Sequence, residues 1–245
     1  MTKIASHRGG AILWPENSLP AFRNALALPA EQLELDVHLS AEGAVVVIHD
    51  ATLDRTTDAS GPVRARSLAA LRAIRLKGTG GAGLPTLAEA AALTREAGKI
   101  LRLELKADGA GRPYPGIVPA CLAVLDAAAM RERTVLMSFE SRTLAEAAAA
   151  TREKGLARLV FLLGEKPWRG MGPEGAIALC GACRAEELGL PIGELDAASV
   201  GVLRAAGLGV SAWGCNDEAT IRQGLKLGLD VIATDDPPLA LHLRG

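Results

Sequence analysis

The chain has 245 residues, a formal net charge of −1 and no long run of basic residues. It therefore lacks the basic surface that binds nucleic acid or attracts a membrane, and no nucleic-acid partner is expected. No stretch is long and apolar enough to cross a bilayer, and the N-terminus lacks the apolar core of a signal peptide. We expect a cytoplasmic protein without membrane insertion. The length suits one large α/β barrel about as well as two small domains.

Short β-rich runs alternate with alanine- and leucine-rich helical runs along the chain. The predicted strands are residues 3–6, 32–37, 100–105, 134–138, 158–163, 176–180, 208–213 and 230–234. The predicted helices are residues 18–28, 86–97, 117–130, 141–153, 196–206 and 218–227, and a closing helix follows Pro238. Their candidate N-caps are Ser18, Thr86, Ser141 and Asp217. The fifth helix has no regular candidate, because "GEKPWRGMGPEG" is too rich in glycine and proline.

Eight repeats of strand and helix predict an α/β fold, a (β/α)8 TIM barrel with its site at the carboxyl ends of the strands. The segment "QLELDVHLSAEGAVVVIHD", residues 32–50, breaks this rhythm. Its two apolar runs are too close for a parallel crossover, so they predict an antiparallel hairpin. With a turn centred on Glu42 and Gly43, Asp36 would lie opposite His49. We predict one domain over residues 1–245, with a small insertion of about residues 38–85 after the second strand.

Acidic residues occupy one face of two predicted strands. Glu34 and Asp36 alternate with apolar residues in the second strand, and Glu104 does so in the third, between Arg102 and Lys106. Charges inside a barrel are costly unless they are paired or bind an ion. The three carboxylates therefore favour one divalent cation, Mg²⁺, Ca²⁺ or Mn²⁺. The alternative is internal salt bridging, with Arg102 and Lys106 neutralising the acids.

Three of the four histidines fall within the first fifty residues. His7 ends the first strand and His49 ends the second arm of the hairpin, so both can reach the rim that holds the carboxylates. Two histidines at such a rim suit general acid and general base catalysis near neutral pH. His38 shares the acidic face and is a spare candidate, whereas His242 is expected on a helix surface.

Two cations lie next to these residues in the sequence. Arg8 follows His7, and Lys106 lies two residues after Glu104. Fixed cations beside a metal suit an anionic phosphate. The alternative for Arg8 is a structural ion pair with an acid such as Glu16. Trp213, at the end of the seventh strand, is either an apolar wall for a small ligand or part of the barrel core.

Other residues have weaker signals. Asp235 and Asp236 end the eighth strand, where a cap for the next helix is as plausible as a role in the site. Cys180 and Cys183 form a single CxxC, which without a second pair or a nearby histidine is weak evidence of a redox or zinc element. The cysteines at positions 121 and 215 are expected to be small core residues.

The chain resembles the glycerophosphodiester phosphodiesterase family in a series of motifs. They are "HRGGAILWPENSLPAF", "LELDVHLSAEGAVVVIHDATLDRTT", "LELK", "SF" after the fourth strand, "AWGCN" and "IATDDP". The motifs span almost the whole chain in the order and spacing of the family. The resemblance implies a catalytic barrel with an insertion after the second strand, and hydrolysis of glycerophosphodiesters to sn-glycerol 3-phosphate and an alcohol.

The resemblance also implies roles for individual residues. The implied ligands of one divalent cation are Glu34, Asp36 and Glu104, and the implied acid/base pair is His7 and His49. Arg8, Glu16 and Lys106 match family positions that line the phosphate and metal pocket, and Trp213 matches a position beside the glycerol moiety. The chain departs from the family at Gly214 and Cys215, where threonine and valine are usual, and this loosens the wall around Trp213.

Several alternatives stay open at this point. An internal hydroxyl of the substrate could attack phosphorus and leave a cyclic phosphate, as in a related phosphodiesterase or lyase. A catalytically silent barrel that binds a phospholipid headgroup is the alternative from another class. The expected partner is a small glycerophosphodiester, and a homo-oligomer is equally compatible with the sequence.

Overall fold

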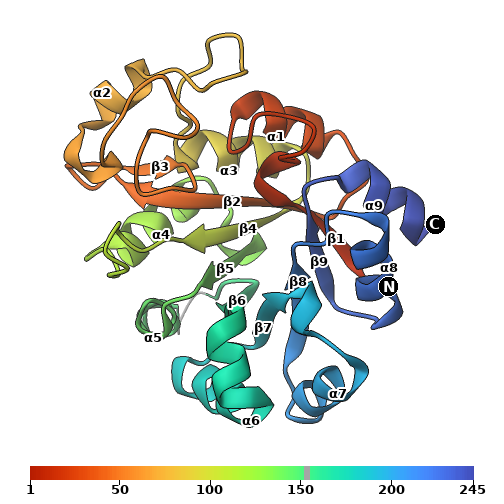
Figure 1. Ribbon diagram of the computed structural model, residues 1–245. Coiled ribbons are helices and arrows are strands. Elements are labelled where there is room, and N and C mark those ends of the chain that lie inside the picture. The colour runs from red at the N-terminus through yellow and green to blue at the C-terminus, as the bar shows by residue number, and fades with distance from the viewer. Residues whose placement is uncertain (152–154) are drawn as a thin grey trace.

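The computed structural model describes residues 1–151 and 155–245, and Figure 1 shows a ring of strands enclosed by helices. Within these residues, eight parallel strands follow the order β1-β9-β8-β7-β6-β5-β4-β2, and pairing of β1 with β2 closes the barrel. The parallel strands are β1 (Lys3–Ser6), β2 (Gln32–Leu39), β4 (Ile100–Leu105), β5 (Thr134–Ser138), β6 (Arg158–Leu162), β7 (Glu187–Pro191), β8 (Gly209–Trp213) and β9 (Val231–Thr234). The predicted TIM barrel is confirmed.

Helices connect the strands and cover the outside of the barrel. They are α1 (Leu19–Leu26), α2 (Leu68–Ala73), α3 (Leu87–Glu96), α4 (Ile117–Ala127), α5 (Ser141–Ala150), α6 (Glu165–Cys183), α7 (Ala197–Ala205), α8 (Glu218–Lys226) and α9 (Pro237–Arg244). Short 3-10 turns lie at η1 (His7–Gly9), η2 (Val63–Ala65), η3 (Arg131–Arg133) and η4 (Ile192–Glu194). Among the described residues, no helix is long and apolar enough to cross a membrane.

Side chains that accept a hydrogen bond from an exposed backbone N–H fix the start of several helices. Ser18, Thr86 and Asp217 are N-caps as predicted, and Thr86 forms a reciprocal capping box with Glu89. The prediction for Ser141 is wrong, because Ser141 is already the first helical residue of α5 and its N-cap is residue 140. The end of the predicted helix 141–153 lies partly outside the described residues.

The predicted strand 176–180 is wrong, since these residues belong to α6. Ala176, Cys180 and Cys183 are buried at helical spacing, and a short apolar run cannot by itself distinguish a strand from a buried helix. The segment expected to be irregular is also largely helical, with its break at Gly172 (φ 65°) just before a proline. The true strand is β7, where a Cβ on Gly189 would lie 2.6 Å from Leu162 Cδ2, so a larger residue would force that side chain to move.

The hairpin is antiparallel as predicted, but its register is one residue from the prediction. β3 (Val45–Val47) pairs with β2 through Val37 opposite Val47 and Leu39 opposite Val45. The turn is therefore centred on residue 42 alone, and Ile48 N donates to Asp36 O at 3.1 Å. His49 lies one residue beyond the position opposite Asp36, because the turn has an odd number of residues.

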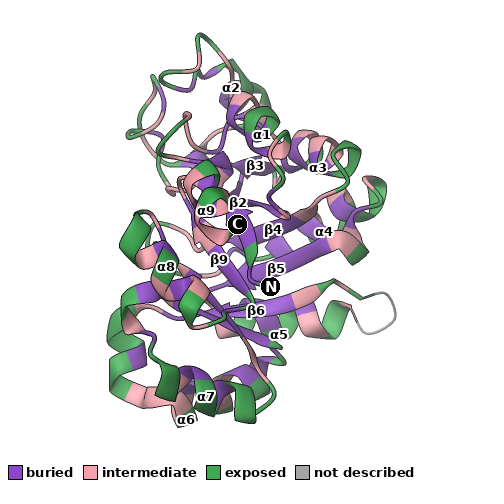
Figure 2. Ribbon diagram, turned by 90° about the vertical axis from the view of Figure 1, so that its right-hand side faces the viewer, coloured by how far each residue is buried: buried purple, intermediate pink, exposed green. Residues whose placement is uncertain are grey.

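The core follows the alternation of the strands. Leu33, Leu35 and Val37 of β2 are buried in the main apolar cluster between the barrel and its helices, as are the leucines of β4. Figure 2 shows the strands mostly buried, whereas the helices expose their outer faces. Inside the barrel, Val135 and Val160 belong to a smaller apolar cluster. The polar faces of β2 and β4 are thus directed toward the barrel interior.

The segment between β3 and α3 has an apolar cluster of its own, which includes Val46, Ile48, Leu53 and Leu71. Figure 1 shows this segment, with α2, beside β2 and β3. The two chain termini lie side by side in both views, where Arg244 Nη1 donates to Thr2 O at 3.1 Å.

Candidate active site

Three carboxylates meet inside the barrel, contributed by two neighbouring strands. Asp36 of β2 is in register with Glu104 of β4, and Glu34 lies two residues earlier on the same face. All three are buried, and one ligand oxygen from each lies within 4.8 Å of the others. This cluster could hold a metal ion, because carboxylate oxygens converging from separate strands are typical ligands of hard cations.

Burial and mutual repulsion shift the protonation of these acids. Burial raises the pKa of Glu104 to about 7 and, together with the charge on Asp36, raises the pKa of Glu34. Burial opposes ionisation of Asp36 as well, but Lys106 and Arg8 outweigh it and hold the pKa of Asp36 well below its usual range. A bound cation would therefore stabilise the ionised forms of Glu34 and Glu104, which burial disfavours.

Lys106 and Arg8 are the cations that contact this cluster. Lys106 Nζ lies 2.6 Å from Glu104 Oε1 and 3.1 Å from Asp36 Oδ1. Arg8 Nε lies 3.2 Å from Asp36 Oδ2, and its Nη1 lies 3.1 Å from Glu16 Oε1. The backbone of Arg8 is left-handed (φ 50°), and its N–H donates to Glu34 Oε2 at 2.8 Å. Arg8 is thus both a structural partner of Glu16 and a neighbour of the acids.

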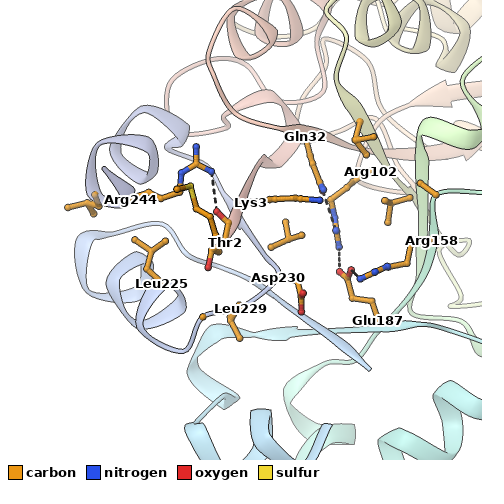
Figure 3. Close-up of a pocket in the computed structure, with 17 residues that line it drawn as sticks. Thr2, Lys3, Gln32, Arg102, Arg158, Glu187, Leu225, Leu229, Asp230 and Arg244 are labelled. Atoms are coloured by element: carbon orange, nitrogen blue, oxygen red, sulfur yellow. Dashed lines mark hydrogen bonds and ion pairs between the residues drawn. The ribbon is translucent and has the colours of Figure 1, made fainter. Parts of the chain in front are cut away.

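Arg102 does not neutralise the three acids. Figure 3 shows it beside Gln32 and Glu187, and its Nη2 donates to Glu187 Oε1 at 2.8 Å. These residues line a cavity of about 620 Å³ at the amino ends of the strands, since Gln32 and Glu187 begin β2 and β7. Of the two cations expected to form salt bridges with the acids, only Lys106 therefore contacts them.

His7 is oriented by Asp235, the residue that follows β9. Its Nδ1 lies 2.6 Å from Asp235 Oδ1, and Asp235 Oδ2 accepts from Asn216 Nδ2 at 2.7 Å. Because a carboxylate only accepts, Nδ1 carries the proton and Nε2 faces the site, 3.9 Å from Glu34 Oε2. Burial lowers the pKa of His7, but Glu34 and Asp235 reverse this and raise it to about 9.

His49 is held in the same way from the inserted segment. Its Nδ1 lies 2.7 Å from Asp50 Oδ1, and Arg55 contacts Asp50 Oδ2 through Nε at 2.7 Å. Arg55 Nη1 also donates to Glu16 Oε2 at 2.6 Å, which ties the insertion to the loop after β1. Burial lowers the pKa of His49. In both histidines an aspartate thus occupies Nδ1 and leaves Nε2 as the other ring nitrogen.

His38 contacts the backbone of His49. Its Nδ1 lies 2.9 Å from the Tyr114 hydroxyl and its Nε2 lies 2.9 Å from the carbonyl oxygen of His49. The side chain is buried, and burial lowers its pKa to about 4, so it is neutral near pH 7. Its geometry is that of a fixed support for the His49 backbone.

A cavity of about 370 Å³ opens over the carboxylates and is lined by His7, Arg8, His49 and Lys106. Its other wall is apolar and includes Phe139 and Trp213, whose ring centroids lie 6.3 Å apart in an edge-to-face arrangement. Trp213 is half-buried and packs on the apolar cluster inside the barrel, while its role as a wall for a ligand stays a prediction. The cavity pairs a charged wall with an aromatic one.

Sequence reasoning missed several side chains that hold the site. Asn17 donates to Asp36 Oδ2 at 2.9 Å, and Asn216 binds Asp235. Asp50 and Arg55 were available as part of "HDATLDRTT", but no periodicity separates them from ordinary loop residues. Phe139 follows β5 directly, a position at the carboxyl end of a strand that could have marked it.

The remaining sequence candidates lie away from the cavity. Asp236 caps α9 by accepting from Leu239 N at 3.0 Å, whereas its neighbour Asp235 belongs to the site. Cys180 and Cys183 are buried in the main apolar cluster, and burial raises the pKa of Cys180 to about 12. His242 is exposed on α9, as expected. The cysteines at positions 121 and 215 are buried core residues, also as expected.

Comparisons with known proteins identify the family of the chain. The family model described as "Glycerophosphoryl diester phosphodiesterase family" matches residues 7–239. A glycerophosphodiester phosphodiesterase of Bacillus altitudinis is 30% identical over 100% of this chain and 98% of its own length.

Solved structures share the whole fold. A family member from Agrobacterium tumefaciens strain C58 superposes with a TM-score of 0.95 at 34% identity, covering 100% of this chain and 97% of that one. An Oleispira antarctica phosphodiesterase, solved in complex with the product sn-glycerol-3-phosphate, has a TM-score of 0.85 at 26% identity, covering 99% of this chain and 96% of that one. The chain belongs to the glycerophosphoryl diester phosphodiesterase family and is an enzyme of that family, as its motifs predict.

Proposed function

We propose that this enzyme hydrolyses glycerophosphodiesters to sn-glycerol 3-phosphate and an alcohol, using one divalent cation and two histidines. One observation carries the proposal: three buried carboxylates converge beside two histidines, each of which has Nδ1 bound to an aspartate. The product complex of the Oleispira antarctica relative supports the choice of substrate.

The donor set of Glu34, Asp36 and Glu104 fits Mg²⁺, Ca²⁺ or Mn²⁺. Within the described residues, Asp36 Oδ1 is buried and contacts Lys106 Nζ at 3.1 Å, so a bound cation would share this oxygen with the Lys106 ion pair. When bound, the cation would polarise a phosphoryl oxygen and favour attack at phosphorus.

The cations and the aromatic wall would position the substrate. Arg8 and Lys106 border the cavity and can neutralise the phosphate as negative charge develops on it. Glu16 keeps Arg8 in place through its ion pair. Trp213 would pack against the glycerol moiety, because its ring forms the apolar wall.

His7 and His49 would move the protons. With each Nδ1 engaged, Nε2 is the nitrogen that can exchange a proton with the substrate or water. One histidine assists the attacking group and the other protonates the leaving alkoxide. Asp235 and Asp50 hold the two rings in the required tautomer.

The inserted segment would be part of the catalytic unit. We propose that residues 1–245 act as one catalytic domain, in which the insertion of about residues 38–85 contributes His49, Asp50 and Arg55. The ion pair from Arg55 to Glu16 supports this assignment, because it links the insertion to the loop that carries Arg8.

Phosphorus NMR of the reaction with glycerophosphocholine tests the proposal. Direct appearance of sn-glycerol 3-phosphate is expected, and a His49→Ala variant should lose at least about a hundredfold in kcat/KM. A persistent cyclic phosphate would establish the lyase reaction instead. Full activity of His49→Ala would refute the role of this histidine, and binding without turnover would identify a headgroup-binding barrel.

A further inference from the structure

A second hollow, of about 330 Å³, adjoins the candidate active site. It shares His49, Glu104, Lys106 and Phe139 with the first cavity, so these four residues separate the two spaces. Trp213 borders only the first cavity. A phosphodiester centred on the shared residues would therefore extend one substituent toward Trp213 and the other into the second hollow.

The second hollow is acidic. Beyond the shared residues it is lined by three carboxylates, from Asp50, Asp108 and Glu140, and Lys106 is the one lysine or arginine on its wall among the described residues. Asp50 and Asp108 already pair with Arg55 and Arg112. For Glu140, no ion pair is present within the described ranges, and it is only half-buried, so its charge is available to a ligand.

An aromatic ring completes this environment. The side chain of Phe139 borders the hollow and is 42% exposed, which is unusual for a large apolar residue that lies next to buried strands. An exposed aromatic side chain beside a carboxylate can attract ammonium and quaternary ammonium groups, through cation–π and ionic attraction together. Neutral polyols gain neither contribution.

We propose that the second hollow is the leaving-group subsite and that it selects diesters whose alcohol carries a positive charge, such as choline or ethanolamine. The inference rests on the proposed function, because it places phosphate at the shared wall and glycerol beside Trp213. Glu140 attracts the charged group, Phe139 contacts its methyl or methylene surface, and His49 borders the bond that breaks.

Substrate competition tests this subsite. The wild type should hydrolyse glycerophosphocholine and glycerophosphoethanolamine with kcat/KM values at least about fivefold above that for glycerophosphoglycerol. Glu140→Gln should lower that ratio by about threefold or more, and Phe139→Leu should lower it most for the choline diester. Glu146→Gln is the matched control, because it makes the same charge change at an exposed position of α5 and should keep the wild-type ratio.

The outcomes distinguish failure of the proposed subsite from failure of the proposed function. Equal kcat/KM values for charged and neutral diesters, or a ratio that neither variant changes, would overturn the subsite while leaving the phosphodiesterase function in place. Failure to hydrolyse any of the three diesters with a panel of divalent metals would overturn the proposed function itself. Because each variant is compared on two substrates, a partial loss of folded protein does not alter the ratio.

Discussion

Replacing His38 with glutamine should change how the stability of the fold depends on pH. His38 is buried between the Tyr114 hydroxyl and the carbonyl oxygen of His49, and burial lowers its pKa to about 4. The unfolded chain should have a histidine pKa of about 6.5. Between these two values the unfolded state binds more protons than the folded state, so the free energy of unfolding falls as the pH falls.

The expected size follows from the two pKa values. The stability that neutral His38 confers is intact above about pH 6.5 and is lost progressively as the pH falls toward about 4. Between pH 7 and pH 5 this linkage amounts to about 2 kcal/mol. The His38→Gln variant, which does not titrate, should therefore lose about 2 kcal/mol less than the wild type over the same interval.

Urea unfolding at pH 7 and pH 5 measures this difference, provided that both proteins unfold in one cooperative transition. The variant will also lose stability at pH 7, so the comparison concerns the change with pH and not the absolute value. His242→Gln is the control, since His242 is exposed on α9, and it should behave as the wild type. An identical pH dependence in His38→Gln and the wild type would refute the assignment of His38 as a neutral buried support.

Two further predictions concern the residues that hold the histidines. Asp235→Asn should lower kcat at least about a hundredfold with a smaller change in KM, because an amide cannot fix the His7 tautomer. Asp236→Asn is the control: it alters only the α9 cap and should keep normal steady-state kinetics. Arg55→Ala should lower kcat/KM about tenfold by releasing Asp50 and the insertion, and restoration of a partial rate by Arg55→Lys would agree with this role. Arg72→Ala removes a comparable exposed ion pair and should leave the kinetics unchanged, and an equal loss in both variants would contradict the prediction for Arg55.

The barrel and its acidic rim could be predicted because their signals are local. Alternation along β2 and β4 assigns Glu34 and Glu104 to the inward face, and this holds whatever surrounds them. Strand β7 was not recognised, because glycine and proline are unfavourable in strands and both Gly189 and Pro191 lie within it. Because β7 was not recognised, the sixth strand was predicted at residues 176–180, which belong to α6.

The partners of the site residues were harder to predict, because they are distant in sequence. His7 and Asp235 are 228 positions apart, and the pairing of Arg102 with Glu187 spans 85 positions. The hairpin register depended on whether its turn was odd or even, which the residues around Gly43 do not determine. Tertiary packing, and not local preference, decides each of these contacts.

Metal removal is the most direct test of the central claim that buried carboxylates bind a catalytic cation. After exhaustive chelation, hydrolysis of glycerophosphocholine should cease, and adding back Mg²⁺, Ca²⁺ or Mn²⁺ should restore it. Asp36→Ala should be inactive with or without added metal and should bind less metal at equilibrium, because it removes one of the three buried carboxylates that would hold the ion. Full activity of the chelated wild type, with metal content verified as negligible, would contradict the account and leave the three carboxylates as structural groups.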